Sequence, residues 1–147
     1  MINVDAFEDE IDLLQNIYEH GYYEYRNPSE NFTTCTKSHF NRVVRQDRYG
    51  VYIVRQRDTQ EVLYIGKSGT IDSHGKFKKQ DIPGRLTNIR GTDKPNVQFR
   101  NLLQEKGPLK IEYIFLPTSK SPSFVEKALL QAYLNEYNHL PYKNKEL

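Results

Sequence analysis

The chain has 147 residues, enough for one ordinary domain with a buried core and short appendages. Its 11 tyrosines and 7 phenylalanines mean that a hydrophobic fraction of 37% does not indicate disorder. The apolar runs are far shorter than a membrane span and no secretory leader is predicted, while a single cysteine, Cys35, excludes an internal disulfide and is typical of the reducing cytoplasm.

The net charge of +2 conceals an uneven distribution along the chain. Residues 1–25 hold seven acidic residues and no Lys or Arg, whereas residues 26–147 hold all 21 basic residues against 12 acidic ones. A basic domain behind an acidic leader suits a polyanionic partner such as DNA or RNA. Because charge runs are commonly only solvated faces, this signal alone leaves both interpretations open.

The first third of the chain is predicted as an acidic N-terminal helical extension over residues 1–47. Within it, residues 5–20 place apolar side chains at helical spacing between acids, which predicts an amphipathic helix that ends at Gly21. Residues 22–36 show no clear period, and a short helical segment is expected over residues 40–44.

A β-hairpin is predicted next, around a polar turn at residues 58–60. If Arg57 and Glu61 pair across this turn, Tyr52 and Tyr64 lie on one face of the hairpin as diagonal neighbours within aromatic reach. A slip of one residue would move the two tyrosines to opposite faces.

The remaining elements complete a domain over residues 48–147. The predicted strands cover residues 50–56, 61–66 and 111–116, and a Gly/Lys/Asp-rich loop covers residues 67–83. The predicted helices begin at Pro83 or Gly84 and end at Arg90, cover residues 96–106, and begin at Ser121 or Ser123 and end at Tyr137. We therefore expect an α+β fold, with a small three-stranded antiparallel or mixed sheet flanked by helices.

Five sequence elements occur in a recognisable order. They are Gly50-Val51-Tyr52 in the first strand, Tyr64-Ile65-Gly66 at the end of the hairpin, Arg85 on the following helix, Glu126 on the last helix and Asn144 in the tail. This pattern resembles the GIY-YIG nuclease family over roughly residues 48–147. The resemblance implies a metal-dependent endonuclease that hydrolyses DNA phosphodiester bonds with Mg²⁺ or Mn²⁺.

The chain departs from the family pattern at two places. The segment between the second tyrosine and Arg85 is longer than usual, so residues 70–83 look like an insertion of the kind found in some restriction-enzyme members. Many members also carry a histidine one helical turn after the arginine, where Ile89 stands here.

Phosphodiester hydrolysis assigns a role to each of these side chains. Glu126 suits Mg²⁺, which prefers oxygen ligands and keeps several waters, and Arg85 suits phosphate oxygens. Tyr52 is the expected proton acceptor, provided that a cation such as Lys67, Arg85 or the metal lowers its pKa. Tyr64 would support that network. The resemblance alone implies that Asn144 organises the site.

Structural alternatives exist for the same residues. Two tyrosines in a hairpin are commonly a packed cross-strand pair. Glu126 completes a capping-box pattern with Ser123, which would leave it to satisfy a backbone N–H. Taken alone, Arg85 would be a surface arginine. Lys67-Ser68 lacks the earlier glycine of a nucleotide-binding loop, so no nucleotide cofactor is expected, and the four histidines show no zinc-ligand spacing.

Basic residues around the expected site are predicted to contact phosphates without reading sequence. They are Arg48, Arg55, Lys67, Lys76, Lys78, Lys79 and Arg90. For the insertion lysines a solvated loop charge is an equal alternative.

Three functional readings follow. The leading one is the Mg²⁺-dependent DNA endonuclease, and the second is a nucleic-acid-binding module with the same fold and little or no catalysis. In the third, which is compatible with the first, the acidic segment docks on a partner or masks the DNA face. Because one active site cuts one strand, cutting a duplex needs a homodimer or two successive events.

Overall fold

The structure is a computed structural model that describes residues 6–92 and 94–147. The helices in this part of the chain are α1 (Ala6–Ile17), α2 (Phe32–Phe40), α3 (Ile82–Thr87), α4 (Pro95–Lys106) and α5 (Pro122–Tyr137). The strands are β1 (His20–Tyr25), β2 (Gly50–Gln56), β3 (Val62–Ser68), β4 (Thr70–Ile71), β5 (Phe77–Lys78) and β6 (Leu109–Phe115).

The main sheet has four strands in the order β1-β6-β2-β3, and every neighbouring pair is antiparallel. The expected α+β class is confirmed, but the expectation of three strands is wrong because β1 was not predicted. In β1, Tyr23 and Tyr25 are buried while Tyr22 is exposed, so the segment follows the alternation of an edge strand with one face on the core.

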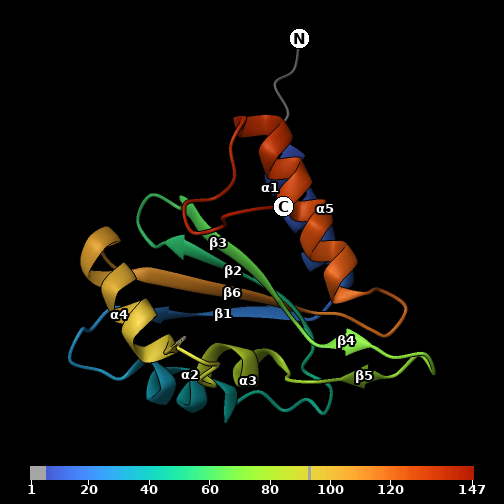
Figure 1. Ribbon diagram of the computed structural model, residues 1–147, viewed down its shortest axis with the longest axis horizontal. Coiled ribbons are helices and arrows are strands. Elements are labelled where there is room, and N and C mark those ends of the chain that lie inside the picture. Colours follow the sequence, from blue (N-terminus) through green and yellow to red (C-terminus); the bar gives the residue numbers. More distant parts are fainter. Residues whose placement is uncertain (1–5, 93) are drawn as a thin grey trace.

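Helices cover both faces of this sheet (Figure 1). On one face, α1 and α5 pack against each other and α5 packs on β2 and β3, around a core that includes Phe7, Ile53 and Leu129. On the other face, α2, α3 and α4 contact one another and enclose a core that includes Phe40, Tyr52 and Leu86. Strand β3 lies at one edge of the sheet, where α3 contacts it from one face and α5 from the other.

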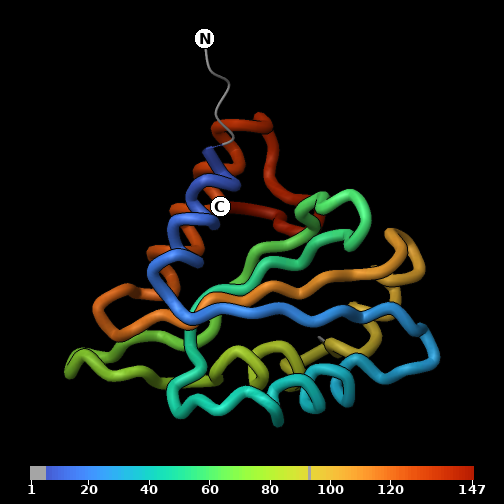
Figure 2. Tube along the Cα trace, turned by 180° about the vertical axis from the view of Figure 1, so that it is seen from behind, coloured from blue at the N-terminus to red at the C-terminus, as the bar shows by residue number. Residues whose placement is uncertain are grey.

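The described part of the predicted N-terminal extension belongs to this fold. Figure 2 shows α1 lying alongside α5 and β1 running along the outer edge of the sheet. Phe7 is fully buried and Ile11 is nearly so. The start of the helix expected over residues 5–20 lies outside the described residues, and its end is at Ile17 rather than Gly21, which pairs with Tyr113 instead. The boundary at residue 47 therefore separates no independent unit.

The hairpin of β2 and β3 has the register that places the tyrosines together. Tyr52 lies opposite Gly66, and Val54 lies opposite Tyr64, as expected. The assumed pairing of Arg57 with Glu61 is absent, because a β-bulge between Val54 and Arg55 shifts the register near the turn. The prediction that the two tyrosines share one face is confirmed, although the pairing of Arg57 with Glu61 from which it was argued is wrong.

Side-chain caps define where the helices near the sheet edge begin. The Asp81 carboxylate accepts a hydrogen bond from the backbone N–H of Gly84 at the start of α3, and Ser121 accepts one from Phe124 at the start of α5. The helix expected over residues 40–44 is wrong. Instead, α2 ends at Phe40, and its N-cap is Asn31.

The predicted insertion contains a short hairpin of β4 and β5 that projects from the body of the protein (Figure 1). The Asp72 carboxylate accepts hydrogen bonds from the backbone of His74 and Lys76 in its turn. At its base, Phe77 stacks on Tyr49 with ring centroids 4.5 Å apart. The segment therefore contains two short strands and is not a loop throughout.

Among the described helices, none is long and apolar enough to cross a membrane.

Candidate active site at the free edge of the sheet

Two tyrosines form the floor of the candidate site. Tyr52 on β2 is 4% exposed and Tyr64 on β3 is half-buried, and their ring centroids are 6.1 Å apart. The Tyr52 ring lies against the backbone of Gly66, where a Cβ atom would come within 2.4 Å of its Cζ atom. Only glycine fits at this position, which explains why a glycine ends the Tyr64-Ile65-Gly66 element.

Arg85 comes to these tyrosines from α3. Burial raises the pKa of both Tyr52 and Tyr64, and the charge and hydrogen bonding of the Arg85 guanidinium oppose that rise. Arg85 is half-buried, and its Nε atom is buried without a hydrogen-bond partner among the described residues. Buried polar atoms are normally paired, so the unpaired Nε atom sets this guanidinium apart from an arginine that only supports the structure.

Glu126 approaches the same edge from α5. The capping interpretation is wrong, because Ser121 caps this helix and Glu126 lies in its second turn. Burial raises the pKa of the half-buried Glu126 carboxyl, while Lys127, Lys67 and Arg85 act to lower it. A carboxylate that burial destabilises but that faces three cations is the kind of group found at functional sites.

Lys67 follows Gly66 on β3 and joins the cluster. Burial lowers the pKa of its ammonium group, and the nearby carboxylate of Glu126 opposes this, while Arg85, Lys79 and Lys127 add to the lowering. Its Nζ atom also donates a long hydrogen bond to the Gly69 carbonyl oxygen, at 3.4 Å. Lys67 and Glu126 thus join Tyr52, Tyr64 and Arg85 in one cluster of polar side chains at this edge of the sheet.

Asn144 acts on this edge through the backbone. Its side-chain Oδ1 accepts a hydrogen bond from the Ile65 N–H at 2.9 Å, and its Nδ2 donates one to the Ile65 carbonyl at 3.0 Å. The Lys143 N–H donates to the Leu63 carbonyl at 2.8 Å. The tail therefore pairs with the outer side of β3, and Asn144 holds it there at Ile65, between Tyr64 and Gly66.

The electrostatics of Tyr52 constrain its chemistry. Burial and the neighbouring Tyr64 raise the pKa of its hydroxyl well above the ordinary value, and the effect of Arg85 does not offset this. In the protein alone, Tyr52 is therefore protonated at neutral pH. A tyrosine that accepts a proton at neutral pH needs a lowered pKa. Arg85 and Lys67 alone do not lower the pKa of Tyr52 below its ordinary value.

The donor set limits which metal the site could hold. Among residues 6–92 and 94–147, no group of three or more His, Cys, Asp or Glu side chains is arranged to hold an ion. Mg²⁺ does not need such a group, because it is commonly held by one or two carboxylates together with waters and substrate phosphates. The single carboxylate of Glu126 fits that pattern, and it does not fit zinc.

The basic residues that were expected to contact phosphates lie in different surroundings. Lys76, Lys78 and Lys79 are exposed on the insertion hairpin. Arg48, by contrast, forms an ion pair with Asp81 at 3.3 Å and so supports the start of α3.

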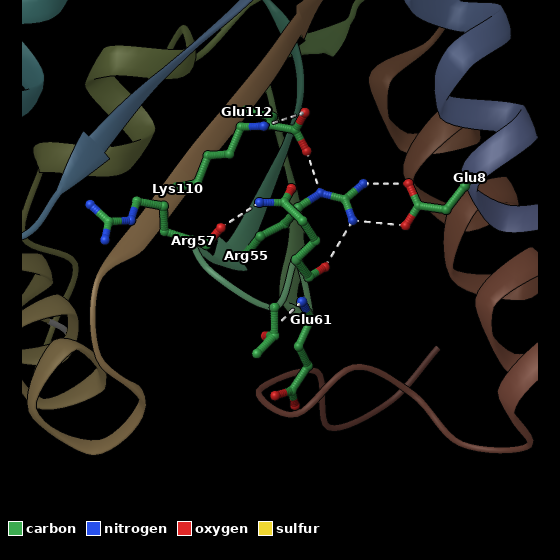
Figure 3. Close-up of polar contacts among 8 residues, drawn as sticks. Glu8, Arg55, Arg57, Glu61, Lys110 and Glu112 are labelled. Atoms are coloured by element: carbon green, nitrogen blue, oxygen red, sulfur yellow. Dashed lines mark hydrogen bonds and ion pairs between the residues drawn. The ribbon is translucent and has the colours of Figure 1, made fainter.

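The expectation for Arg55 is corrected, because its side chain is 3% exposed and its guanidinium lies between two carboxylates (Figure 3). Both terminal nitrogens bind the Glu8 carboxylate at 2.7 Å, and Nε donates to Glu112. Arg55 therefore belongs to the interior and cannot reach a nucleic acid.

Several residues that line the site were not predicted. A cavity beside Tyr52 and Tyr64 is also lined by Arg90, Asn101 and Lys145. Of these, only Arg90 was expected to bind nucleic acid. The only local signal for the tail is the placement of lysines on both sides of Asn144, and Asn101 lies on a helix that reaches the site only through the fold.

Comparisons of this chain with protein-family models, with curated proteins and with solved structures find no match. The assignment of a function therefore depends on the geometry and chemistry of the site and on the sequence pattern.

Proposed function

We propose that this protein is a Mg²⁺-dependent endonuclease that hydrolyses phosphodiester bonds of DNA through a GIY-YIG-type site. The main support is a single observation. Tyr52, Tyr64 and Arg85, from two strands and a helix, line one cavity, and the two tyrosine rings lie 6.1 Å apart. The charges of Arg85 and Glu126 act on both tyrosines, and Lys67 lies near Glu126 and Arg85. These residues span 75 positions in the sequence, so they are brought together by the fold and not by being close along the chain.

Each side chain has a role in this proposal. Arg85 and Lys67 bind the phosphoryl oxygens and neutralise their charge. Glu126 would hold the ion, which supplies positive charge at the same oxygens and to the attacking water. Tyr52 would accept the proton of that water only as its phenolate, which requires the bound ion to lower the pKa of its hydroxyl, and Tyr64 contacts the same phosphate. Asn144 keeps β3, and with it Tyr64, at the correct position along the edge.

One observation favours a second candidate, a DNA-binding module without efficient catalysis. The raised pKa of Tyr52 means that its hydroxyl is a hydrogen-bond donor in the protein alone and not a base. The same cations would still bind a phosphate backbone. The two candidates differ in cleavage and not in DNA affinity.

The test is cleavage of supercoiled plasmid by the wild type and by Glu126→Ala, each with Mg²⁺ or EDTA. We expect metal-dependent nicking by the wild type and a loss of at least about 100-fold in Glu126→Ala, the usual scale for one essential electrostatic group. The matched control is Glu136→Ala, which removes another carboxylate from α5 ten positions further along and should retain activity.

The outcomes separate the candidates. Equal cleavage by the wild type and Glu126→Ala would place the activity elsewhere or in a contaminant. DNA binding that weakens with salt, without cleavage by the wild type, would favour the binding module. The ratio of nicked to linear product over time also indicates whether two copies cut together, as a homodimer would, or one copy cuts twice.

A further inference from the structure

A cavity of about 400 Å³ lies beside the tyrosine pair, between the sheet, α3 and α4. Tyr52, Tyr64 and Arg85 line it, so it is continuous with the candidate site. Its volume falls within the range of about 300–1,000 Å³ that is typical of pockets for small ligands. It is therefore large enough for more than a phosphate group.

The inner surface of the cavity is apolar. Val54, Leu86 and Leu102 line it and are at most 5% exposed. Phe99 on α4 adds a half-buried aromatic ring, one face of which stacks on Phe32 at a centroid distance of 3.8 Å. A surface of this kind gains free energy by burying a flat apolar group.

The polar lining is cationic and amidic. It consists of Arg85, Arg90, Lys143 and Lys145, with Gln98 and Asn101 from α4. The Nε atoms of both arginines are buried and have no hydrogen-bond partner among the described residues. Four cationic side chains on the lining of one cavity favour an anionic ligand.

The C-terminal tail forms one side of the cavity, where Lys143 and Lys145 line it. It is attached to β3 at one point and to α4 at another. Asn144 binds the backbone of Ile65 on β3, and the Tyr142 hydroxyl donates a hydrogen bond to Glu105 on α4. The Lys106 ammonium lies 4.3 Å from the centre of the Tyr142 ring. Because these contacts exist in the protein alone, the cavity is preformed, which lowers the cost of binding.

We propose that this cavity binds one unstacked nucleotide of the DNA strand, next to the phosphodiester that is cleaved. A continuous sugar-phosphate backbone would need only cations. An unstacked base also needs an apolar or aromatic wall and amide groups at its edge, and both are present here. This inference rests on the proposed function, which assigns the shared residues Tyr64 and Arg85 to the phosphate.

The experiment uses ¹⁵N-labelled full-length Glu126→Gln, and amide chemical shifts report binding. The probes are thymidine 3′,5′-bisphosphate and the abasic deoxyribose 3′,5′-bisphosphate, which carry the same charges and differ only in the base. We expect the thymidine probe to bind at least about fivefold more tightly, the scale of one stacked base. The shifts should include the amides of Leu86, Asn101 and Leu102.

Two further variants, made in the same Glu126→Gln protein, locate the binding. Asn101→Phe fills the cavity from α4 and should reduce binding of the thymidine probe to the abasic level. Gln104→Phe adds the same ring to the same helix at an exposed position outside the lining, and should keep the preference.

Equal affinity for the two probes, or an unchanged preference in Asn101→Phe, would overturn the inference. Cleavage of plasmid by the wild type is judged separately. An active enzyme with no preference for the base removes this inference alone, whereas the absence of metal-dependent cleavage removes the proposed function, whatever the probes show.

Discussion

At the scale of single residues, Glu126 links the proposed chemistry to stability. Burial raises the pKa of its carboxyl, so the folded protein disfavours the charged form relative to the unfolded chain. The resulting loss of stability is absent below the ordinary pKa of about 4.3, and it is complete once the pH exceeds the raised pKa of the folded state. A site that holds a cation would keep such a carboxylate in spite of this cost.

We therefore expect Glu126→Gln to melt at a higher temperature than the wild type at pH 7.5, although it should lose cleavage activity. Because glutamine carries no charge at any pH, the advantage should shrink as the pH falls and disappear near pH 3, well below the ordinary pKa, where the wild-type carboxyl is protonated in both states. Thermal unfolding followed by circular dichroism at the two pH values measures this. A lower melting temperature for the variant at pH 7.5 would contradict the idea that burial dominates at this residue.

The local prediction of the site also belongs to this scale. Tyr52 and Tyr64 could be placed on one face because strand alternation is a local property of the sequence. The pKa direction of Tyr52 could not be anticipated, because it depends on burial under α3, which the sequence does not show. The need for glycine at position 50, in the Gly50-Val51-Tyr52 element, also comes from a distant part of the chain. A Cβ atom at Gly50 would lie 2.0 Å from the carbonyl oxygen of Ile114, on a strand 64 positions later in the sequence.

At the scale of secondary-structure elements, a buried ion-pair network joins α1 to the sheet. Arg55 on β2 binds Glu8 on α1 with two nitrogens and also donates to Glu112 on β6, while the Lys110 ammonium lies 3.8 Å from Glu112 (Figure 3). From the sequence, Arg55 was expected to contact phosphates because it is one of several basic residues around the expected site. Its two partners lie 47 and 57 positions away, so no local pattern could identify them.

Arg55→Ala should lower the free energy of unfolding by about 3 kcal/mol, because it takes the guanidinium away from the buried Glu112 and leaves only the Lys110 ammonium, 3.8 Å away, to balance that carboxylate. Arg57→Ala is the matched control two positions further on. Its ion pairs with Asp58 and Glu24 are exposed to solvent, so its removal should change stability little.

Urea unfolding of both variants measures the difference. If Arg55→Ala fails to fold, Glu8→Gln provides a milder test, because the Glu8 side chain is 36% exposed and its loss leaves the pairing of Arg55 with Glu112. Equal stability of the Arg55 and Arg57 variants would show that the network contributes nothing to the attachment of α1.

Strand β1 shows why an element of the fold escaped prediction. Tyr23 and Tyr25 are buried and Tyr22 is exposed, but adjacent tyrosines give the sequence no visible alternation, and Gly21 matches the end of the preceding helix. In the structure the Tyr113 hydroxyl lies where a side chain at Gly21 would be, 2.4 Å from its ideal Cβ. The glycine is required by contact with a distant strand, and this contact cannot be inferred locally. Helix α4 was predicted closely because Pro95 and Gly107, which mark its two ends, are visible in the sequence, and α5 because Pro122 marks its start.

At the scale of the whole molecule, the acidic N-terminal segment cannot be removed as a separate unit. Deleting residues 1–25 would take away α1 and β1, and with them Phe7 and Tyr25, which are fully buried in the two cores. Such a deletion would therefore test folding rather than masking of a DNA face or self-association. The uneven charge is better examined by exchanging surface side chains on the intact fold.

The last prediction concerns where the positive charge acts on DNA. Lys143 and Lys145 lie on the tail at the free edge of β3, whereas Arg26 and Lys37 are exposed near β1 at the opposite edge of the sheet. Each pair carries the same charge, so Lys143→Gln/Lys145→Gln and Arg26→Gln/Lys37→Gln change the net charge equally. DNA affinity falls with salt in proportion to the number of phosphates neutralised, with a logarithmic slope of about 0.9 per contact.

We expect the tail variant to reduce that slope by about 2, and the opposite-edge variant to leave it unchanged, because only contacts at the binding edge release counterions. Fluorescence anisotropy of a labelled duplex, measured from low to moderate salt, gives both slopes. Equal changes in the two variants would mean that the overall field of the protein attracts DNA and that the sheet edge has no special part in binding. A change confined to the tail variant would identify the edge that carries Tyr64 and Glu126 as the surface that DNA contacts.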